Sequence, residues 1–119
     1  MRDKILLVPF PFDDFLKSKL RPCICLTEPI GKFDHIIVAF ITSKPETNPS
    51  DYDIQILESD PDFESTGLLV SSCIRLYRLL TIPISLVERE LGILPEDTSK
   101  LMSKKLMQLF GFKEDITNI

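Results

Sequence analysis

The segment Ile5–Leu26, with the sequence ILLVPFPFDDFLKSKLRPCICL, decides the fold because it joins two apolar strand patterns through a turn. Residues 4–8 form the first pattern. Proline cannot donate a backbone hydrogen bond to a sheet ladder. We therefore expect Pro9 and Pro11 to end the first strand.

The second apolar pattern covers residues 22–27. Proline is tolerated as the first residue of a strand, so Pro22 is expected to begin it, with Arg21 as the last residue of the preceding loop. Lys17 and Lys19 make that loop basic. A guanidinium held at the mouth of a small barrel suits phosphate binding.

The length of 119 residues predicts a single domain covering residues 1–119. No apolar run approaches the roughly 20 residues needed to cross a bilayer, and no signal-peptide cleavage site follows the short apolar run near the amino terminus. We therefore expect a cytoplasmic protein without membrane contact. Three cysteines, an odd number, are typical of reduced thiols rather than of a disulfide framework.

The net charge of −4 argues against nucleic-acid binding, which normally leaves a basic footprint. The distribution weakens this objection. Basic residues cluster near the start of the chain, whereas residues 46–64 carry seven acidic side chains and no basic one. The chain could therefore hold a local basic groove beside an acidic face.

The rest of the chain continues the strand pattern. Residues 33–42 contain the continuous apolar run IIVAFI, as in a central strand covered on both faces, and residues 53–57 alternate as in a half-buried strand. Residues 68–74 and 75–82 suggest two more short strands, and residues 87–94 suggest either a last strand or a helical turn.

A helix is predicted at about residues 96–110, after Pro95 and before Gly111. It carries one apolar stripe for core packing, made of Leu101, Met102, Leu106, Leu109 and Phe110. Short strands closed by one helix predict a mainly β protein with a C-terminal helix, a small, partly open β-barrel. Because side chains fill so small a barrel, its ligand site must lie in an outer groove, at the loops or between subunits.

The sequence gives little support for a metal site or for a nucleophilic site made of cysteine and histidine. His35 is the one histidine and is expected at the surface, while Cys23, Cys25 and Cys73 are expected to be buried. We expect no metal and no cofactor.

Polar side chains recur at the expected strand ends. If residues 22–27 and 33–42 pair as a hairpin turning near residues 29–32, Arg21 falls opposite roughly Thr42, with Ser43 beside it. Such a group is either a phosphate site or a solvated strand end.

Several motifs in order resemble the MazF/PemK family of type II toxin–antitoxin endoribonucleases. They are ILLVPFPF at residues 5–12, KLRP at 19–22, AFITS at 39–43, FESTG at 63–67, SCIRL at 72–76, LLTI at 79–82 and LGIL at 91–94 before the final helix. The resemblance covers nearly the whole chain.

The resemblance implies an SH3-like barrel of the MazF/PemK/CcdB type that forms a homodimer. It implies metal-independent cleavage of single-stranded RNA through the 2′-hydroxyl, and a cognate antitoxin whose disordered tail blocks the RNA groove. By the same resemblance, Arg21, Thr42 and Ser43 are the catalytic residues.

The chemistry of these groups limits their roles. Arginine stays protonated and is a poor base, but its donors suit charge developing on a pentavalent phosphate. Where family members often carry an acidic residue and glutamine, this chain has Ser72 and Cys73, which leaves the proton acceptor open among Asp13, Asp14 and His35.

Lys17, Lys19, Ser72 and Arg75 are the expected RNA-binding residues. For Arg75 a salt bridge to the acidic stretch is the alternative. Two other functions stay open for the whole chain. One is a catalytically silent barrel that binds a peptide or protein, and the other is a topoisomerase-inhibiting toxin of the same fold.

Overall fold

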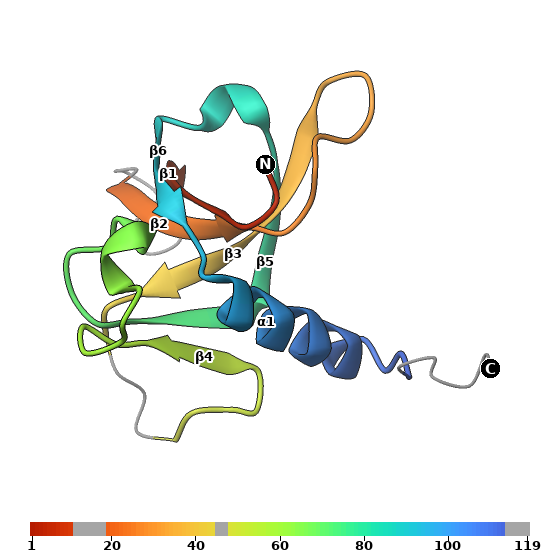
Figure 1. Cartoon of the computed structure of the whole chain (residues 1–119). Coiled ribbons are helices and arrows are strands. Elements are labelled where there is room, and N and C mark those ends of the chain that lie inside the picture. The colour runs from red at the N-terminus through yellow and green to blue at the C-terminus, as the bar shows by residue number, and fades with distance from the viewer. Residues whose placement is uncertain (11–18, 45–47, 114–119) are drawn as a thin grey trace.

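A computed structural model describes residues 1–10, 19–44 and 48–113, which form one strongly curved antiparallel sheet with a helix beside it (Figure 1). The order of the strands across the sheet is β4-β5-β3-β2-β1-β6. The elements are β1 (Lys4–Phe10), β2 (Lys19–Cys25), β3 (His35–Thr42), β4 (Asp53–Ile56), the 3₁₀ turn η1 (Phe63–Thr66), β5 (Ser72–Pro83), the 3₁₀ turn η2 (Ile84–Leu86), β6 (Arg89–Ile93) and α1 (Glu96–Leu109). This is the mainly β, partly open barrel with a C-terminal helix that the sequence predicts.

β1 does not end at Pro9 as expected but runs on to Phe10. Residues two apart in an antiparallel strand point their backbone groups to the same side. The carbonyl of Leu7 faces β6, because it accepts a hydrogen bond from the N–H of Glu88 (2.8 Å). Pro9 therefore faces the same side, beyond the last β1–β6 pair, Leu7–Arg89. No backbone N–H is needed at this position, so Pro9 removes no hydrogen bond from the β1–β6 ladder.

The expected start of β2 at Pro22 is also wrong, because β2 begins at Lys19 and contains Arg21. The N–H of Leu26 donates to Ile37 on β3 (2.9 Å), so Pro22 faces β3 as well. It lies one residue beyond the last β2–β3 pair, Cys23–Phe40, so it stands outside the ladder that the two strands form.

β3 is the central strand that its continuous apolar run predicts, with β2 on one side and β5 on the other. β4 shows the alternating burial expected of a half-buried strand. The two strands expected at residues 68–74 and 75–82 are instead one, β5. Its register shifts where Ala39 pairs with Leu79 but Phe40 with Arg75. The extra residues of β5 form an irregularity at which the strand bends, so β5 continues as one strand instead of two.

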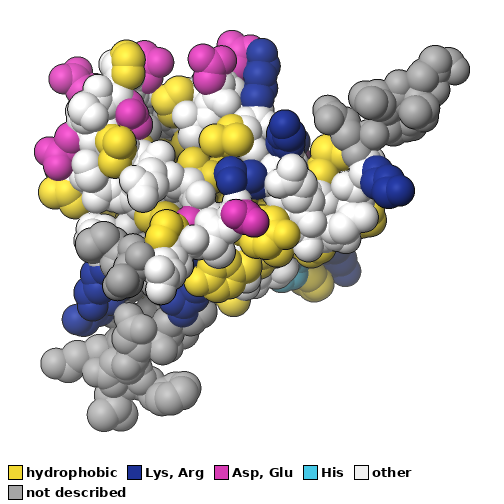
Figure 2. Space-filling model, turned by 90° about the horizontal axis from the view of Figure 1, so that it is seen from below, with side chains coloured by type: hydrophobic (Ala, Val, Ile, Leu, Met, Phe, Trp, Pro, Cys, Tyr) yellow, Lys and Arg dark blue, Asp and Glu magenta, His cyan; other side chains and the backbone are white. Residues whose placement is uncertain are grey.

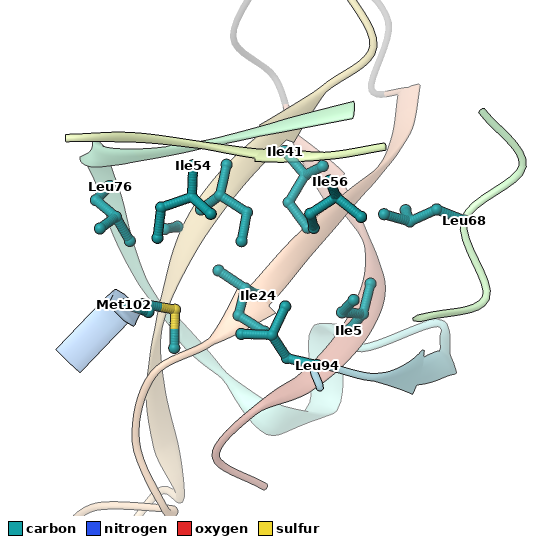
Figure 3. Packing of buried hydrophobic residues seen from close by; sticks show 11 residues of the cluster. Ile5, Ile24, Ile41, Ile54, Ile56, Leu68, Leu76, Leu94 and Met102 are labelled. Atoms are coloured by element: carbon teal, nitrogen blue, oxygen red, sulfur yellow. The ribbon is translucent and has the colours of Figure 1, made fainter. Parts of the chain in front are cut away.

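The main core lies inside the curve of the sheet (Figure 3). Isoleucines from five strands, β1 to β5, fill its centre, while Met102 of α1 enters from one end and Leu68, from the loop before β5, from the other. Burial of such side chains is the main stabilising term. Residues 87–94, left open between strand and helix, supply β6 and then Leu94 of this core.

α1 matches the predicted helix to within one residue, and Gly111 ends it with a φ of 76° and an N–H donated to Gln108. Met102 is fully buried, with Leu106 and Leu109 packed against the same cluster. Leu101 and Phe110 were expected in this stripe, but they are 44% and 56% exposed because they lie at its flanks. Among the described residues, no helix is long and apolar enough to cross a membrane.

All three cysteines are free thiols and buried, as predicted. Cys23 and Cys25 share the second, smaller core on the other face of the sheet. Burial, assisted by the neighbouring Cys25, raises the pKa of Cys23 to about 12.

Candidate functional site

The β2–β3 register brings the predicted pair of site residues together. Cys25 pairs with Val38, Ile24 with Ala39 and Cys23 with Phe40. The same register continued by two residues places Arg21 opposite Thr42, as the sequence predicted. Both side chains line one cavity of about 280 Å³ at the end of the barrel.

This barrel-end cavity is lined by residues of five strands, β1, β2, β3, β5 and β6, and of the loop before β5. Its polar lining residues are Arg21, Thr42, Ser43, Ser72 and Arg89. The others are apolar or glycine, namely Leu7, Pro22, Ile41, Gly67, Leu68, Leu69, Val70 and Leu91. Three predicted catalytic residues and one predicted RNA-binding residue therefore share one cavity.

One wall of the cavity is fixed by close contact between η1 and β6. Gly67 has a φ of 73°, and a Cβ there would lie 2.0 Å from the carbonyl oxygen of Leu91. On the opposite side, a Cβ at Gly92 would lie 2.3 Å from the carbonyl oxygen of Ser65. The buried Thr66 hydroxyl donates to Phe63 (2.6 Å) and accepts from the N–H of Leu68 (3.2 Å). Only glycine permits this approach, which holds the loop before β5 against the barrel.

The hydroxyl groups of the cavity have defined directions. Thr42 Oγ1 accepts a hydrogen bond from the N–H of Lys44 (3.1 Å), which leaves its proton for a ligand. Ser72 Oγ donates its proton to the carbonyl of Val70 (2.8 Å), so toward a ligand it can only accept.

A second cavity of about 220 Å³ adjoins the first. Thr42, Ser43 and Ser72 line both cavities and so form a shared wall. The remaining lining residues of the second cavity are Lys44, Pro49, Gln55, Leu57, Ser71 and Cys73.

The cavities are electrostatically one-sided. Arg21 and Arg89 line the first and Lys44 the second, and no described lining residue of either is acidic or a histidine. On the face shown in Figure 2, Asp and Glu side chains gather mainly at the upper left, and Lys and Arg side chains are scattered among hydrophobic and other side chains elsewhere. An acidic chain thus presents a cationic site, which suits a phosphate group.

Two other predicted RNA-binding residues lie outside the cavities. Lys19 is exposed at the start of β2, on the same face as Arg21 because side chains two apart in a strand share a face. Arg75 is only 6% exposed, and its Nη2 donates to the carbonyl of Lys44 (3.4 Å). Its opposite residue on β4 is Asp53. Lys17 lies outside the described residues.

Of the three candidate proton acceptors, His35 is the one that the structure describes, and it lies far from the cavity. His35 begins β3 and Thr42 ends it. At about 3.3 Å per residue, this separates them by roughly 23 Å. The structure therefore argues against His35, and Asp13 and Asp14 lie outside the described residues.

Sequence reasoning missed Arg89 as a site residue. Arg89 lies opposite Leu7 at the last β1–β6 pair, and this pairing carries it to the cavity. The one available signal was the spacing of apolar residues within 87–94. It indicates that these residues can form a strand, but it does not show which strand they pair with. Leu69 and Val70, 90% and 48% exposed, were also missed as the rim of the cavity.

Comparisons with known proteins agree with this geometry. A family model described as "PemK-like, MazF-like toxin of type II toxin-antitoxin system" matches residues 1–110. No curated protein is detectably similar in sequence.

Solved structures share the fold. The Mycobacterium tuberculosis toxin MazF-mt6 superposes with a TM-score of 0.71 at 18% identity, over 93% of this chain and 99% of that one. An endoribonuclease in complex with its cognate antitoxin, from a mycobacterial species, gives a TM-score of 0.69 at 12% identity, over 96% and 97% of the two chains. An endoribonuclease from a mycobacterial species gives 0.67 at 12% identity, over 96% and 93%.

Proposed function

Because the chain belongs to the family of PemK-like, MazF-like toxins of type II toxin–antitoxin systems, we propose that it is a metal-independent endoribonuclease that cleaves single-stranded RNA in the cytoplasm. One observation carries the proposal. The guanidinium groups of Arg21 and Arg89 and the hydroxyl groups of Thr42 and Ser43 line a single cavity.

In the proposed reaction the RNA 2′-hydroxyl oxygen attacks the adjacent phosphorus atom. The bond from phosphorus to the 5′-oxygen breaks, leaving a cyclic 2′,3′-phosphate on one fragment, and the released 5′-oxygen takes a proton from solvent to become a 5′-hydroxyl on the other. Arg21 stabilises the negative charge on the pentavalent phosphate. Thr42, whose proton is available, and Ser43 orient a phosphate oxygen.

The proton of the 2′-hydroxyl needs an acceptor. Arginine and hydroxyl side chains are poor bases, and the described lining residues include no carboxylate or imidazole. We therefore place the acceptor outside this set, with Asp13 and Asp14 as the candidates in this chain.

The proposal extends to partners. Lys17, Lys19 and Ser72 contact the RNA as it leaves the cavity, whereas the burial of Arg75 favours a supporting role at the Lys44 carbonyl. One structural neighbour is an endoribonuclease bound to its cognate antitoxin. By analogy, two copies of this chain form a homodimer, and a cognate antitoxin inserts a disordered tail over the cavity.

Cleavage of a labelled single-stranded RNA in excess EDTA tests the proposal. The wild type should cut and leave a cyclic phosphate, and a 2′-deoxy nucleotide at the cut position should stop the reaction. Arg21→Ala should lower the rate about 10²–10³-fold, the typical effect of removing one transition-state donor. Arg21→Lys should restore only part of it, since lysine lacks the forked donors. An inactive wild type, or an Arg21→Ala variant of equal activity, would refute the proposal.

The exposed rim of Leu69 and Val70 supports a second candidate, a silent barrel that binds an apolar peptide. Salt distinguishes the two functions. Affinity for RNA falls steeply with salt because counterions are released from the phosphates, whereas affinity for an apolar peptide does not.

A further inference from the structure

The second cavity differs in chemistry from the barrel-end cavity. Its lining combines hydroxyl groups and the amide of Gln55 with the apolar side chains of Pro49 and Leu57, and the one cation among its described lining residues is the exposed Lys44. The barrel-end cavity carries two guanidinium groups instead. The two cavities therefore suit different parts of one ligand, an anionic part in the first and a flat, mostly apolar part in the second.

The sheet register fixes Gln55 beside the shared wall. Thr42 pairs with Cys73, and Cys73 pairs with Gln55, so one row of side chains crosses β3, β5 and β4 on the same face. The next row, Ile41–Ile74–Ile54, points into the main core. Gln55 therefore cannot turn inward without a change of register.

The surroundings of Gln55 leave its amide available. Its side chain is exposed and makes no hydrogen bond to any residue that the structure describes. Of the neighbouring polar groups, the Lys44 carbonyl accepts from Arg75 (3.4 Å), and Ser71 Oγ accepts from the N–H of Glu58 (2.8 Å) and keeps its proton. An amide offers one acceptor and two donors in one plane.

Size limits the ligand. Cavities for drug-sized molecules span about 300–1,000 Å³, and the second cavity measures about 220 Å³. A single planar base fits this volume better than a longer piece of RNA. Proteins read single-stranded RNA by turning bases out and hydrogen-bonding their edges.

We infer that the second cavity binds the nucleobase next to the scissile phosphate and that Gln55 determines which base is accepted. The phosphate lies at the shared wall beside Thr42 and Ser43, the guanidinium groups hold it from one side, and the base enters from the other. This inference rests on the proposed ribonuclease function.

Sequencing the ends produced from a random single-stranded RNA library tests it. The wild type should show a base preference at the nucleotide directly beside the cut. Gln55→Glu removes the donors and should change the ratio of bases at that position about tenfold, within the range for a bidentate base contact. Gln55→Met keeps the length but neither hydrogen-bonding group, and should flatten the preference at that position alone.

Gln108→Glu is the matched control, because Gln108 is exposed on α1 and lines neither cavity. Its cleavage profile should equal that of the wild type. A wild type that cleaves while Gln55→Glu and Gln55→Met keep its profile would overturn this inference alone. A wild type that cleaves no RNA would overturn the proposed function, and this inference with it.

Discussion

Gly67→Ala tests whether the contact between η1 and β6 holds the cavity in place. Gly67 has a φ of 73°, and its added Cβ would lie 2.0 Å from the carbonyl oxygen of Leu91 and 2.5 Å from the carbonyl carbon. Both neighbours are backbone atoms of a paired strand. They cannot swing aside as the end of a flexible side chain can, so η1 and β6 must separate.

Two costs add in this variant. A left-handed φ costs a residue with a Cβ about 1–2 kcal/mol. Overpacking that shifts backbone costs about 1–3 kcal/mol more. Gly31 supplies the control, since it has a φ of 78° but no atom within 4 Å of an added Cβ. Gly31→Ala therefore suffers the first cost without the second.

Thermal unfolding and RNA cleavage provide the two measurements. At about 4 °C per kcal/mol for a chain of this length, Gly67→Ala should unfold roughly 4–12 °C below Gly31→Ala. Well below either midpoint, its cleavage rate should also fall, up to about 10²-fold for a shift near 1 Å. Gly31→Ala should cleave as the wild type does. Equal midpoints for the two variants would refute the claim that η1 and β6 are in obligatory contact.

Three further predictions concern the core, a thiol and the second arginine. Met102→Ala should lower the free energy of unfolding in urea by about 2–5 kcal/mol, whereas the half-exposed Leu101→Ala should cost much less. The pKa of Cys23 is raised from 9.0 to about 12, so the unfolded chain loses this proton at lower pH than the folded chain does. The free energy of unfolding should therefore fall as pH rises between these values, by at most about 1.4 kcal/mol per pH unit. Cys23→Ala should flatten that slope, and iodoacetamide should leave Cys23 of the folded protein unmodified at pH 8. Arg89→Ala should reduce the slope of log affinity for RNA against log salt by about 0.7, and Arg89→Lys should retain it; an unchanged slope in Arg89→Ala would remove Arg89 from the site.

The sequence predicts those parts of the fold that depend on neighbours along the chain. The apolar runs and the turn near residues 29–32 suffice for the β2–β3 hairpin, and with it for the approach of Arg21 to Thr42. The helix follows in the same way from its periodicity and from Gly111.

The errors come from contacts between distant segments. Proline breaks a ladder only where its missing N–H would face a partner strand. At Pro9 and Pro22 the ladder on that side has already ended, which depends on where β6 and β3 stop pairing with these strands. No local pattern encodes this. Likewise, the absence of turn formers within residues 72–83 does not reveal that β5 bends against β3.

For the same reason the sequence did not predict Arg89, the second arginine of the barrel-end cavity. The order of the strands in the sheet explains how Arg89 reaches this cavity. β1 lies between β6 and β2. Arg89 pairs with Leu7 on one side, and Arg21 pairs with Val8 on the other. Because successive residues of β1 point to opposite faces, the two arginines start from opposite faces of the sheet, yet both line the cavity at its end. The cavity therefore has a guanidinium group from each face of the sheet, an arrangement that neither arginine could provide alone.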